Sequence, residues 1–313
     1  MFNYRPGMLK SNTPVEYYPE HDIWVKREDL SCDGPRFSKT RGVLAHILNR
    51  NENVIGVLDT AHSQGGWAVA RACYELGREC HLWYPIYKGQ DPSYLPLQQR
   101  EAKRLGAKIH QLPAGRSAVL YHTAKKQLID YKGYMMPNAL KLPETVDETA
   151  AELVRTNQRG FEIPYTLRER GVLDPHNRQV RYRFGIINLH AFESILVSCS
   201  SGTIAAGLIR GLNEIKWVGN VYFHMGYDRP AHSVFNYIEK MSGYTVHGPN
   251  GPWGVYINEE YAYKDTAPKG VEAPFPCNPY YDLKLWAWWI GKGKSGERGR
   301  NEVRGSTLMW NIG

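Results

Sequence analysis

The chain has 313 residues, 42% of them hydrophobic, which is enough apolar material for two lobes of ordinary domain size or one large α/β domain. No apolar run approaches the roughly 20 residues that cross a bilayer, and the first residues lack the apolar stretch of a signal peptide, so we expect a cytoplasmic protein. The formal net charge of +8 favours anionic partners, whether phosphorylated cofactors, anionic metabolites or nucleic acid.

Cysteine and arginine usage narrows the chemistry further. The five cysteines are scattered and form no CxxC, so we expect neither a disulfide framework nor a metal site. Basic residues gather at 155–183 and again at 292–304. Solvated surface is the simplest interpretation of such clusters, and an anion-binding face is the alternative.

Strand and helix signals alternate through the first half of the chain. The run Val54–Thr60 is rich in β-formers, and the amphipathic stretch after Gly66 closes on Gly77, a typical helix C-cap. The same alternation then repeats, giving expected strands at 54–60, 80–85 and 108–113 and expected helices at 67–77, 96–108 and 118–131. This order predicts a parallel sheet with helices on its faces.

The second half resumes this rhythm after an interruption. The segment 155–188 is polar and rich in arginine, and we interpret it as an insertion or a lobe connection. Beyond it we expect strands at 195–199 and 221–227, helices at 203–215 and 283–291, and loops with short strands at 243–279. The alternation extends the α/β prediction to the C-terminal half.

A hydroxyl-rich loop, SCSSGT at 198–203, lies between one expected strand and the helix after it. Its small residues let a ligand approach the backbone, and the N–H groups and dipole of a helix start favour negative charge. The loop therefore predicts either a phosphate site or an ordinary N-capped helix, because serine and threonine are also the preferred caps.

Three further segments carry candidate groups. The segment 26–48 holds two lysines, Lys26 and Lys39, and local sequence alone selects neither of them as catalytic. The loop AHSQGGWAVA at 61–70 joins a strand to a helix and offers its amides to a carboxylate, or is simply a capped helix start. The turn at 277–284 is rich in aromatic residues and, without context, is structural.

The order of these segments resembles the fold-type-II enzymes that depend on pyridoxal 5′-phosphate (PLP), and most closely the branch of ACC deaminase and D-cysteine desulfhydrase. In that branch an early Thr-Pro and K-R-E-D-L precede N-K-x-R, whose lysine binds the cofactor. Here Thr13-Pro14 and Lys26–Leu30 precede Ser38–Arg41. Residues 61–70 stand for the family's S-G-N-T-G loop, 199–208 for its G-S-G-G-T-x-A-G-L and 278–284 for its D-P-x-Y-x-x-K.

The resemblance implies a tryptophan synthase β-like α/β fold, with two lobes of parallel sheet flanked by helices. Residues 1–52 with 157–313 would form the larger, PLP-binding lobe and 53–156 the smaller one, with the active site in the cleft between them. Lys39, and not Lys26, would carry PLP as a Schiff base. The other implied cofactor contacts are Gln64, Ser200, Ser201, Gly202 and Thr203. The implied substrate contacts are His62, Ser63, Gly65, Gly66 and Tyr280, with the loop at 62–66 receiving the substrate carboxylate.

Several positions depart from the family pattern. Ser38 replaces the asparagine before the lysine, and Gln64 stands where an asparagine meets the phenolic oxygen of PLP. Cys199 and Ser201 replace two glycines of the phosphate loop, and the ending TLMWNIG resembles the family's C-terminal motif only loosely. The partner of the pyridine nitrogen is left open among Glu272, Thr307 and Asn311.

For function, the resemblance implies a lyase or transferase that forms an external aldimine with an amino acid, removes the α-proton and completes a β-elimination, a β-replacement or a deamination. A second hypothesis is that the enzyme transfers or remodels an amino acid on a nucleic-acid base, as in phage thymidine hypermodification. The positive charge and the aromatic residues would suit DNA as an anionic acceptor. A third hypothesis is a non-catalytic protein with the PLP fold. A homodimer is expected, because homodimers are common in the family.

Overall fold

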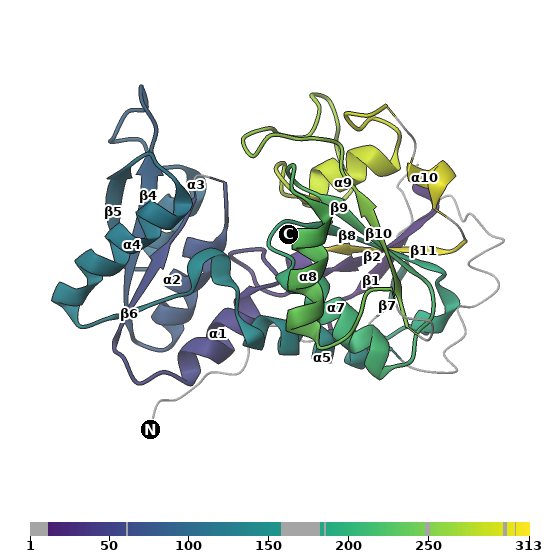
Figure 1. The fold of residues 1–313 in the computed structure, drawn as a ribbon, viewed down its shortest axis with the longest axis horizontal. Helices are drawn as coiled ribbons and strands as arrows, with labels where there is room; N and C mark the ends of the chain where they lie inside the picture. The colour runs from purple at the N-terminus through teal and green to yellow at the C-terminus, as the bar shows by residue number, and fades with distance from the viewer. Residues whose placement is uncertain are drawn as a thin grey trace. The chain divides into compact units, whose positions relative to one another are not determined.

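The structure is a computed structural model that describes residues 12–60, 62–157, 182–184, 186–247, 251–296, 299–303 and 305–313. The described chain divides into two compact units, a smaller one of Cys32–Thr145 and a larger one of residues 12–31 with Val146–Gly313 (Figure 1). The predicted lobes, 1–52 with 157–313 and 53–156, stay a prediction, and the compact units break the chain elsewhere, after residues 31 and 145. Most of the Arg-rich segment 155–188 lies outside the described residues.

The smaller unit is a four-stranded parallel sheet with the order β5-β4-β3-β6. Its strands are β3 (Val54–Leu58), β4 (Glu79–Ile86), β5 (Lys108–Pro113) and β6 (Tyr134–Met135). Its helices are α1 (Thr40–Leu48), α2 (Gly65–Glu75), α3 (Leu97–Arg104) and α4 (Ser117–Leu128). The expected alternation of strands and helices in this part of the chain is confirmed, with ends shifted by a few residues.

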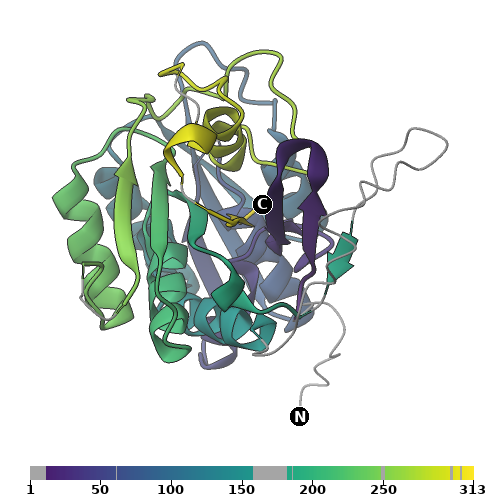
Figure 2. The ribbon, with the colours of Figure 1, turned by 90° about the vertical axis from the view of Figure 1, so that its right-hand side faces the viewer.

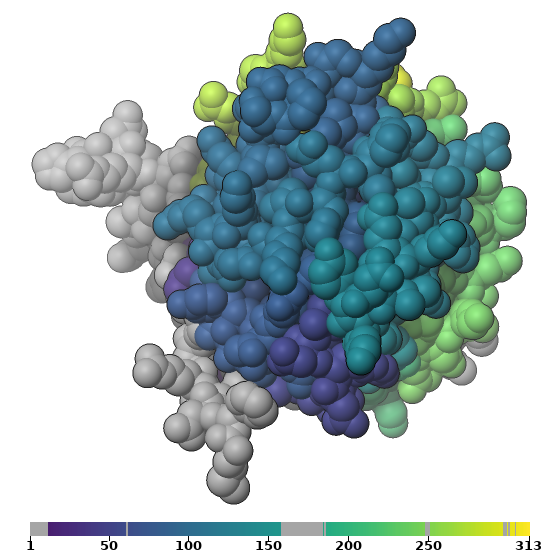
Figure 3. All heavy atoms as spheres, turned by 90° about the vertical axis from the view of Figure 1, so that its left-hand side faces the viewer, coloured from purple at the N-terminus to yellow at the C-terminus, as the bar shows by residue number. Residues whose placement is uncertain are grey.

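Side chains of the smaller unit alternate between the two faces of its sheet. Leu82 and Tyr84 pack with residues of α1, α2 and α3, whereas Trp83 between them packs with α4. In the space-filling view, side chains of the blue-to-teal segments of this unit form a closely packed surface (Figure 3). The sheet is thus buried on both sides, as parallel sheets require.

The larger unit is a seven-stranded sheet with the order β10-β9-β8-β11-β2-β1-β7. Its strands are β1 (Val15–Tyr18), β2 (Ile23–Arg27), β7 (Tyr182–Phe184), β8 (Ser194–Cys199), β9 (Asn220–Met225), β10 (Trp253–Ile257) and β11 (Thr307–Asn311). The five strands from β10 to β2 are parallel to their neighbours, and β1 is antiparallel to β2 and β7. The parallel α/β architecture is confirmed, and the antiparallel edge was not predicted.

Helices cover both faces of the larger sheet (Figure 2). These helices are α5 (Pro143–Thr156), α7 (Thr203–Glu214), α8 (Ala231–Ser242), α9 (Asp282–Trp289) and α10 (Gly299–Glu302). Val197 of β8 packs with α5, α7 and α8, and Leu196 beside it packs with α9. Within the described chain, no helix combines the length and apolarity of a membrane span.

The C-terminal strand β11 lies in the middle of this sheet, between β8 and β2, and all five of its residues are buried. The sequence TLMWNIG was interpreted only as a loose end motif, because a short apolar run carries little periodic signal. Its position matters for function, since the carboxyl end of β11 meets the carboxyl ends of β8 and β2 at one edge of the sheet.

Candidate active site

Lys39 directly precedes α1 in the smaller unit. Its backbone is already helical, and the residue is only 7% exposed. The Nζ atom lies 3.4 Å from the carbonyl oxygen of Ala139 and 5.8 Å from the ring centre of Phe37. The neighbouring hydroxyl of Ser38 is buried and has no hydrogen-bond partner among the described residues. A buried hydroxyl of this kind beside a lysine fits a site that a bound ligand completes.

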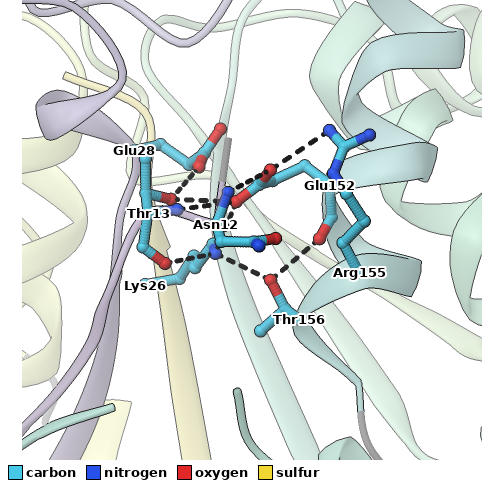
Figure 4. Close-up of polar contacts among 7 residues, drawn as sticks. All are labelled: Asn12, Thr13, Lys26, Glu28, Glu152, Arg155 and Thr156. Carbon is cyan, nitrogen blue, oxygen red and sulfur yellow. Dashed lines mark hydrogen bonds and ion pairs between the residues drawn. The ribbon is translucent and has the colours of Figure 1, made fainter. Parts of the chain in front are cut away.

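Lys26, the other buried lysine of this segment, has a different environment in the larger unit. Its ammonium group donates to the carbonyl oxygen of Thr13 (2.5 Å), the carboxylate of Glu152 (2.7 Å) and the hydroxyl of Thr156 (2.7 Å) (Figure 4). An ammonium group has three hydrogens to donate, and all three are used here. Lys26 therefore ties β2 to α5, and the choice of Lys39 over Lys26 as the cofactor lysine stays a prediction.

We call the surrounding residues the Lys26 cluster, defined as Asn12, Thr13, Lys26, Glu28, Glu152, Arg155 and Thr156 (Figure 4). Glu152 lies at its centre, with a completely buried side chain. It accepts hydrogen bonds from the backbone N–H groups of Asn12 (3.0 Å) and Thr13 (2.9 Å), besides the ion pair with Lys26. The Thr-Pro and K-R-E-D-L segments are thus joined by hydrogen bonds of Thr13 with Lys26 and Glu28, and the buried ion pair of Lys26 with Glu152 joins them to α5.

The loop at 62–66 leads from β3 to α2 in the smaller unit, and it brings five predicted residues to one helix start. The Gly65 N–H donates to the Ser63 hydroxyl (2.9 Å), and His62, Ser63 and Gln64 are half-buried. Packing at the helix start is tight, because a Cβ atom on Gly66 would lie 2.6 Å from Oδ2 of Asp59. The glycines therefore allow the helix backbone to approach a buried carboxyl group.

That carboxyl group belongs to Asp59, which the sequence interpretation did not single out. Asp59 directly follows β3 and is 2% exposed. Burial raises the pKa of Asp59 to about 7, although hydrogen bonds from Ser63 and from the N–H groups of Thr60 and Gly66 oppose this change. An acidic residue straight after an apolar strand was the signal that could have revealed it.

The turn Ser200–Thr203 joins β8 to α7 in the larger unit. Gly202 has a φ of +87°, and a Cβ atom there would lie 2.9 Å from the ring of Tyr237. The hydroxyl oxygens of Ser201 and Thr203 are 3.1 Å apart. Together with the N–H groups that begin the 12-residue helix α7, these hydroxyls form a donor set that suits a phosphate group.

Two residues outside the motif extend this turn. The Tyr237 hydroxyl lies 3.1 Å from the Thr203 hydroxyl, and the Arg229 guanidinium donates to the carbonyl oxygen of Ser200. The backbone of Arg229 is itself fixed, because its carbonyl oxygen accepts a hydrogen bond from the Tyr256 hydroxyl. Arg229 brings a positive charge to the turn, which a phosphate dianion would match.

The aromatic turn before α9 contains a second buried carboxyl group. The side chain of Asn278 accepts a hydrogen bond from the N–H of Tyr280 (2.9 Å), and Tyr280 is half-buried. Asp282 begins α9 and is completely buried, with one oxygen accepting from the Ile312 N–H (3.2 Å) and the other without a partner among the described residues. Burial raises the pKa of Asp282 to about 8.

Asp282 is linked to the phosphate turn through its neighbour Tyr281. A Cβ atom on Gly226 would lie 2.9 Å from the Tyr281 ring, and the Gly226 N–H donates to the carbonyl oxygen of Cys199 (3.0 Å). Cys199 ends β8, directly before the phosphate turn. The larger unit therefore places a hydroxyl-rich turn and a buried carboxyl group at one edge of its sheet.

The three residues considered for the pyridine nitrogen differ in position. Glu272 is exposed. Thr307 begins β11 opposite Ser194, the first residue of β8, so it lies at the far end of that strand from the phosphate turn. Asn311 ends β11, is buried, and donates to Asp29 (2.9 Å) and to the carbonyl oxygen of Pro276 (3.0 Å). Asn311 therefore lies at the edge that also carries Asp282.

The donor set of each unit, taken by itself, suits a polar group of PLP. In the larger unit, the hydroxyl-rich helix start with its arginine would hold the phosphate, and the buried carboxyl group would hold the ring nitrogen. In the smaller unit, the buried amine of Lys39 would bind the aldehyde.

Comparison with known proteins agrees with this fit. The chain is 42% identical over 315 residues to a glycyl-dTMP PLP-dependent decarboxylase of Pseudomonas phage M6, an alignment that covers 98% of this chain and all of the relative. No family model matches the chain. Fold and site define a fold-type-II PLP-dependent enzyme. More particularly, the chain belongs to the family of the phage PLP-dependent decarboxylase that it matches over its full length.

Solved structures show the same fold. An ACC deaminase homologue matches with a TM-score of 0.68 and 16% identity, covering 99% of this chain and 91% of the other. Maize serine racemase matches with a TM-score of 0.58 and 12% identity, covering 96% and 88% of the two chains. The diaminopropionate ammonia lyase of Escherichia coli matches with a TM-score of 0.55 and 13% identity, covering 100% and 83%. The predicted fold family and the PLP cofactor are confirmed.

Proposed function

We propose that this enzyme removes the carboxylate of an amino acid that is joined to a thymidine nucleotide. The observation that carries the proposal is the full-length similarity to a relative whose name gives glycyl-dTMP as the substrate. The reaction breaks the bond between Cα and the carboxylate, releases carbon dioxide and adds a proton at Cα. It develops the second of the expected hypotheses, the remodelling of an amino acid on a nucleic-acid base.

PLP supplies an electron sink for the pair left on Cα when carbon dioxide departs. Lys39 is the residue that would hold the cofactor covalently, and its amine, once freed by the substrate, would return the proton to Cα. The position of Lys39 supports this role, because the residue is buried just before α1 and the hydroxyl of the preceding Ser38 has no hydrogen-bond partner among the described residues.

Residues of the larger unit would bind the two polar ends of the cofactor. Ser200, Ser201, Gly202 and Thr203 would hold the phosphate at the start of α7, with Arg229 supplying a compensating charge. Asp282 would face the pyridine nitrogen, since an aspartate is a common partner of a protonated pyridine ring and one of its oxygens has no partner among the described residues.

The smaller unit's loop would orient the substrate. Ser63, Gly65 and Gly66 lie at the start of α2, where the helix dipole would favour the substrate carboxylate, although the N–H groups of Gly65 and Gly66 already donate to Ser63 and Asp59. The buried Asp59 carboxyl already lies against this helix start. The Asp59 carboxyl would weaken binding of the substrate carboxylate in the ground state. Weaker binding of that group favours a reaction in which its negative charge is lost. Gln64 and Tyr280 stay proposed contacts of the cofactor and the substrate, and homodimeric assembly stays a prediction.

The test uses the holoenzyme with a thymidine nucleotide that carries glycine. We expect release of carbon dioxide and an amine product lighter by one carboxylate, both measured by mass spectrometry, and neither with Lys39→Ala. Release of ammonia instead, or turnover of free amino acids alone, would favour the elimination or deamination hypothesis. A purified protein that neither contains nor takes up PLP would contradict the whole assignment.

A further inference from the structure

We propose that Tyr227 and Tyr263 form a stacking site for the pyrimidine base of the substrate, beside the phosphate turn. This inference rests on the proposed function and adds the residues that would recognise the nucleotide part. Neither tyrosine belongs to the motifs that identify the family in this chain.

Both tyrosines lie at the ligand-binding edge of the larger sheet. Tyr227 follows β9 by two residues, and Tyr263 lies in the loop after β10. Strands β8, β9 and β10 are parallel neighbours, so the loops after all three emerge at the same edge (Figure 1). In open α/β sheets, ligands bind outside the carboxyl ends of the strands. The tyrosines therefore share an edge with the turn at 200–203.

The two rings form a pair that the hydrophobic cores do not explain. Their centres are 5.2 Å apart and their planes meet at 83°. Tyr263 is 38% exposed and Tyr227 is half-buried, and neither ring is part of the hydrophobic clusters formed by the described residues. A rigid aromatic pair that is left partly exposed at a ligand edge suits a base, because every base presents a π-face for stacking.

Positive charge lies against one ring of the pair. The Arg229 guanidinium lies 5.9 Å from the centre of the Tyr227 ring and also donates to the carbonyl oxygen of Ser200. It thus joins the tyrosine pair to the phosphate turn. Lys264, next to Tyr263, is exposed. Burial raises the pKa of Tyr227, so its phenol stays neutral and does not repel a nucleotide phosphate.

The experiment measures binding of dTMP and of a single-stranded thymidine oligonucleotide to the holoenzyme by calorimetry. The variants Tyr227→Leu and Tyr263→Leu remove the rings, whereas Tyr227→Phe and Tyr263→Phe retain them. We expect each leucine variant to weaken binding about tenfold, the typical effect of losing one stacked base, and each phenylalanine variant to bind within about twofold of the wild type. Tyr94→Leu, which changes a 67% exposed tyrosine of the smaller unit, is the matched control.

Two further measurements decide the interpretation. Binding of an abasic oligonucleotide and the absorbance of bound PLP should be the same in all variants, because neither depends on the rings. If dTMP binds more tightly than the oligonucleotide, the substrate is a free nucleotide. If the oligonucleotide binds more tightly, the substrate is a base within a strand. Both results support the base site. Wild-type affinity in Tyr263→Leu, or equal losses in the leucine and phenylalanine variants, would overturn it. If the enzyme decarboxylates the glycine-bearing nucleotide with the same KM in all variants, the inference fails alone and the proposed function stands.

Discussion

The larger unit contains two regions of buried charge, the Lys26 cluster and the carboxyl group of Asp282, and they differ in how that charge is matched. Glu152 in the cluster is paired with Lys26 at 2.7 Å and accepts two backbone N–H groups. Asp282 accepts one backbone N–H, has an oxygen without a partner among the described residues, and has a pKa raised by burial to about 8. A matched buried pair holds elements together, whereas an unmatched carboxyl group indicates a site that a ligand completes.

The strongest test of this contrast compares the two buried lysines. We expect Lys39→Ala to abolish covalent PLP binding and to lower the rate of the proposed decarboxylation by about a thousandfold or more, since a positioned base alone contributes roughly 10²–10⁴-fold. The absorbance band of lysine-bound PLP measures the first effect and single-turnover kinetics the second. Lys26→Met should retain the band under conditions in which it is folded. A band that survives Lys39→Ala and disappears in folded Lys26→Met would reverse the assignment.

The second prediction concerns stability. Lys26→Met leaves Glu152 buried without its cation, so we expect the free energy of unfolding to fall by about 3–5 kcal/mol. The double variant with Glu152→Gln should recover a large part of this loss, because the amide keeps an oxygen for the N–H of Thr13 without a buried charge. Urea unfolding of the apoenzyme measures both. If the double variant were as unstable as the single one, the ion pair would not be the source of the loss.

Asp282→Asn should change how the free energy of unfolding depends on pH, in contrast to the substitutions in the Lys26 cluster. The pKa of Asp282 in the folded chain, about 8, lies above its ordinary value of 3.8, so the folded state holds the proton more tightly. Wild-type stability is therefore unaffected below about pH 4 and is lost progressively up to about pH 8, by at most about 1.4 kcal/mol for each pH unit. The apoenzyme of Asp282→Asn should gain stability relative to the wild type over this range.

Urea unfolding at pH 5, 6.5 and 8 measures this difference, with Asp130→Asn at an exposed carboxylate as the matched control. In the holoenzyme, the same asparagine should lower the rate about 10- to 100-fold, if the carboxylate makes a charge-assisted hydrogen bond to the ring nitrogen. A stability difference that stays constant with pH would mean that Asp282 is not the buried, proton-holding group described here.

The contrast also explains how much of the molecule the sequence could predict. Periodicity located the strands and helices from Val54 to Tyr131, and motif order placed Lys39 and the turn at 200–203. Asp59 was not singled out although its position directly after an apolar strand was a local signal, whereas Asp282 and Arg229 were missed because their importance comes from burial and from contacts between segments far apart in the chain. Arg229 meets Ser200 across 29 residues and Asp282 meets Ile312 across 30. No local pattern encodes such contacts.

Arg229 gives the last and smallest expected effect. Its guanidinium contacts the carbonyl oxygen of Ser200, where a cofactor phosphate would be matched by a positive charge. Arg229→Met should therefore weaken PLP binding about tenfold or somewhat more, the cost of one charge-assisted hydrogen bond. Binding of pyridoxal, which has the same ring and aldehyde but no phosphate, should not change.

Fluorescence titration of the apoenzyme with each compound measures the two affinities. Arg210→Met is the matched control, because Arg210 lies on α7 but bonds to Asp147 and to the carbonyl oxygens of Met241 and Ser242. Equal losses for PLP and pyridoxal would mean that Arg229 supports the shape of the turn and does not balance the phosphate. Arg229 would then belong with the matched, structural charges of the Lys26 cluster, because its role would be to hold two segments together.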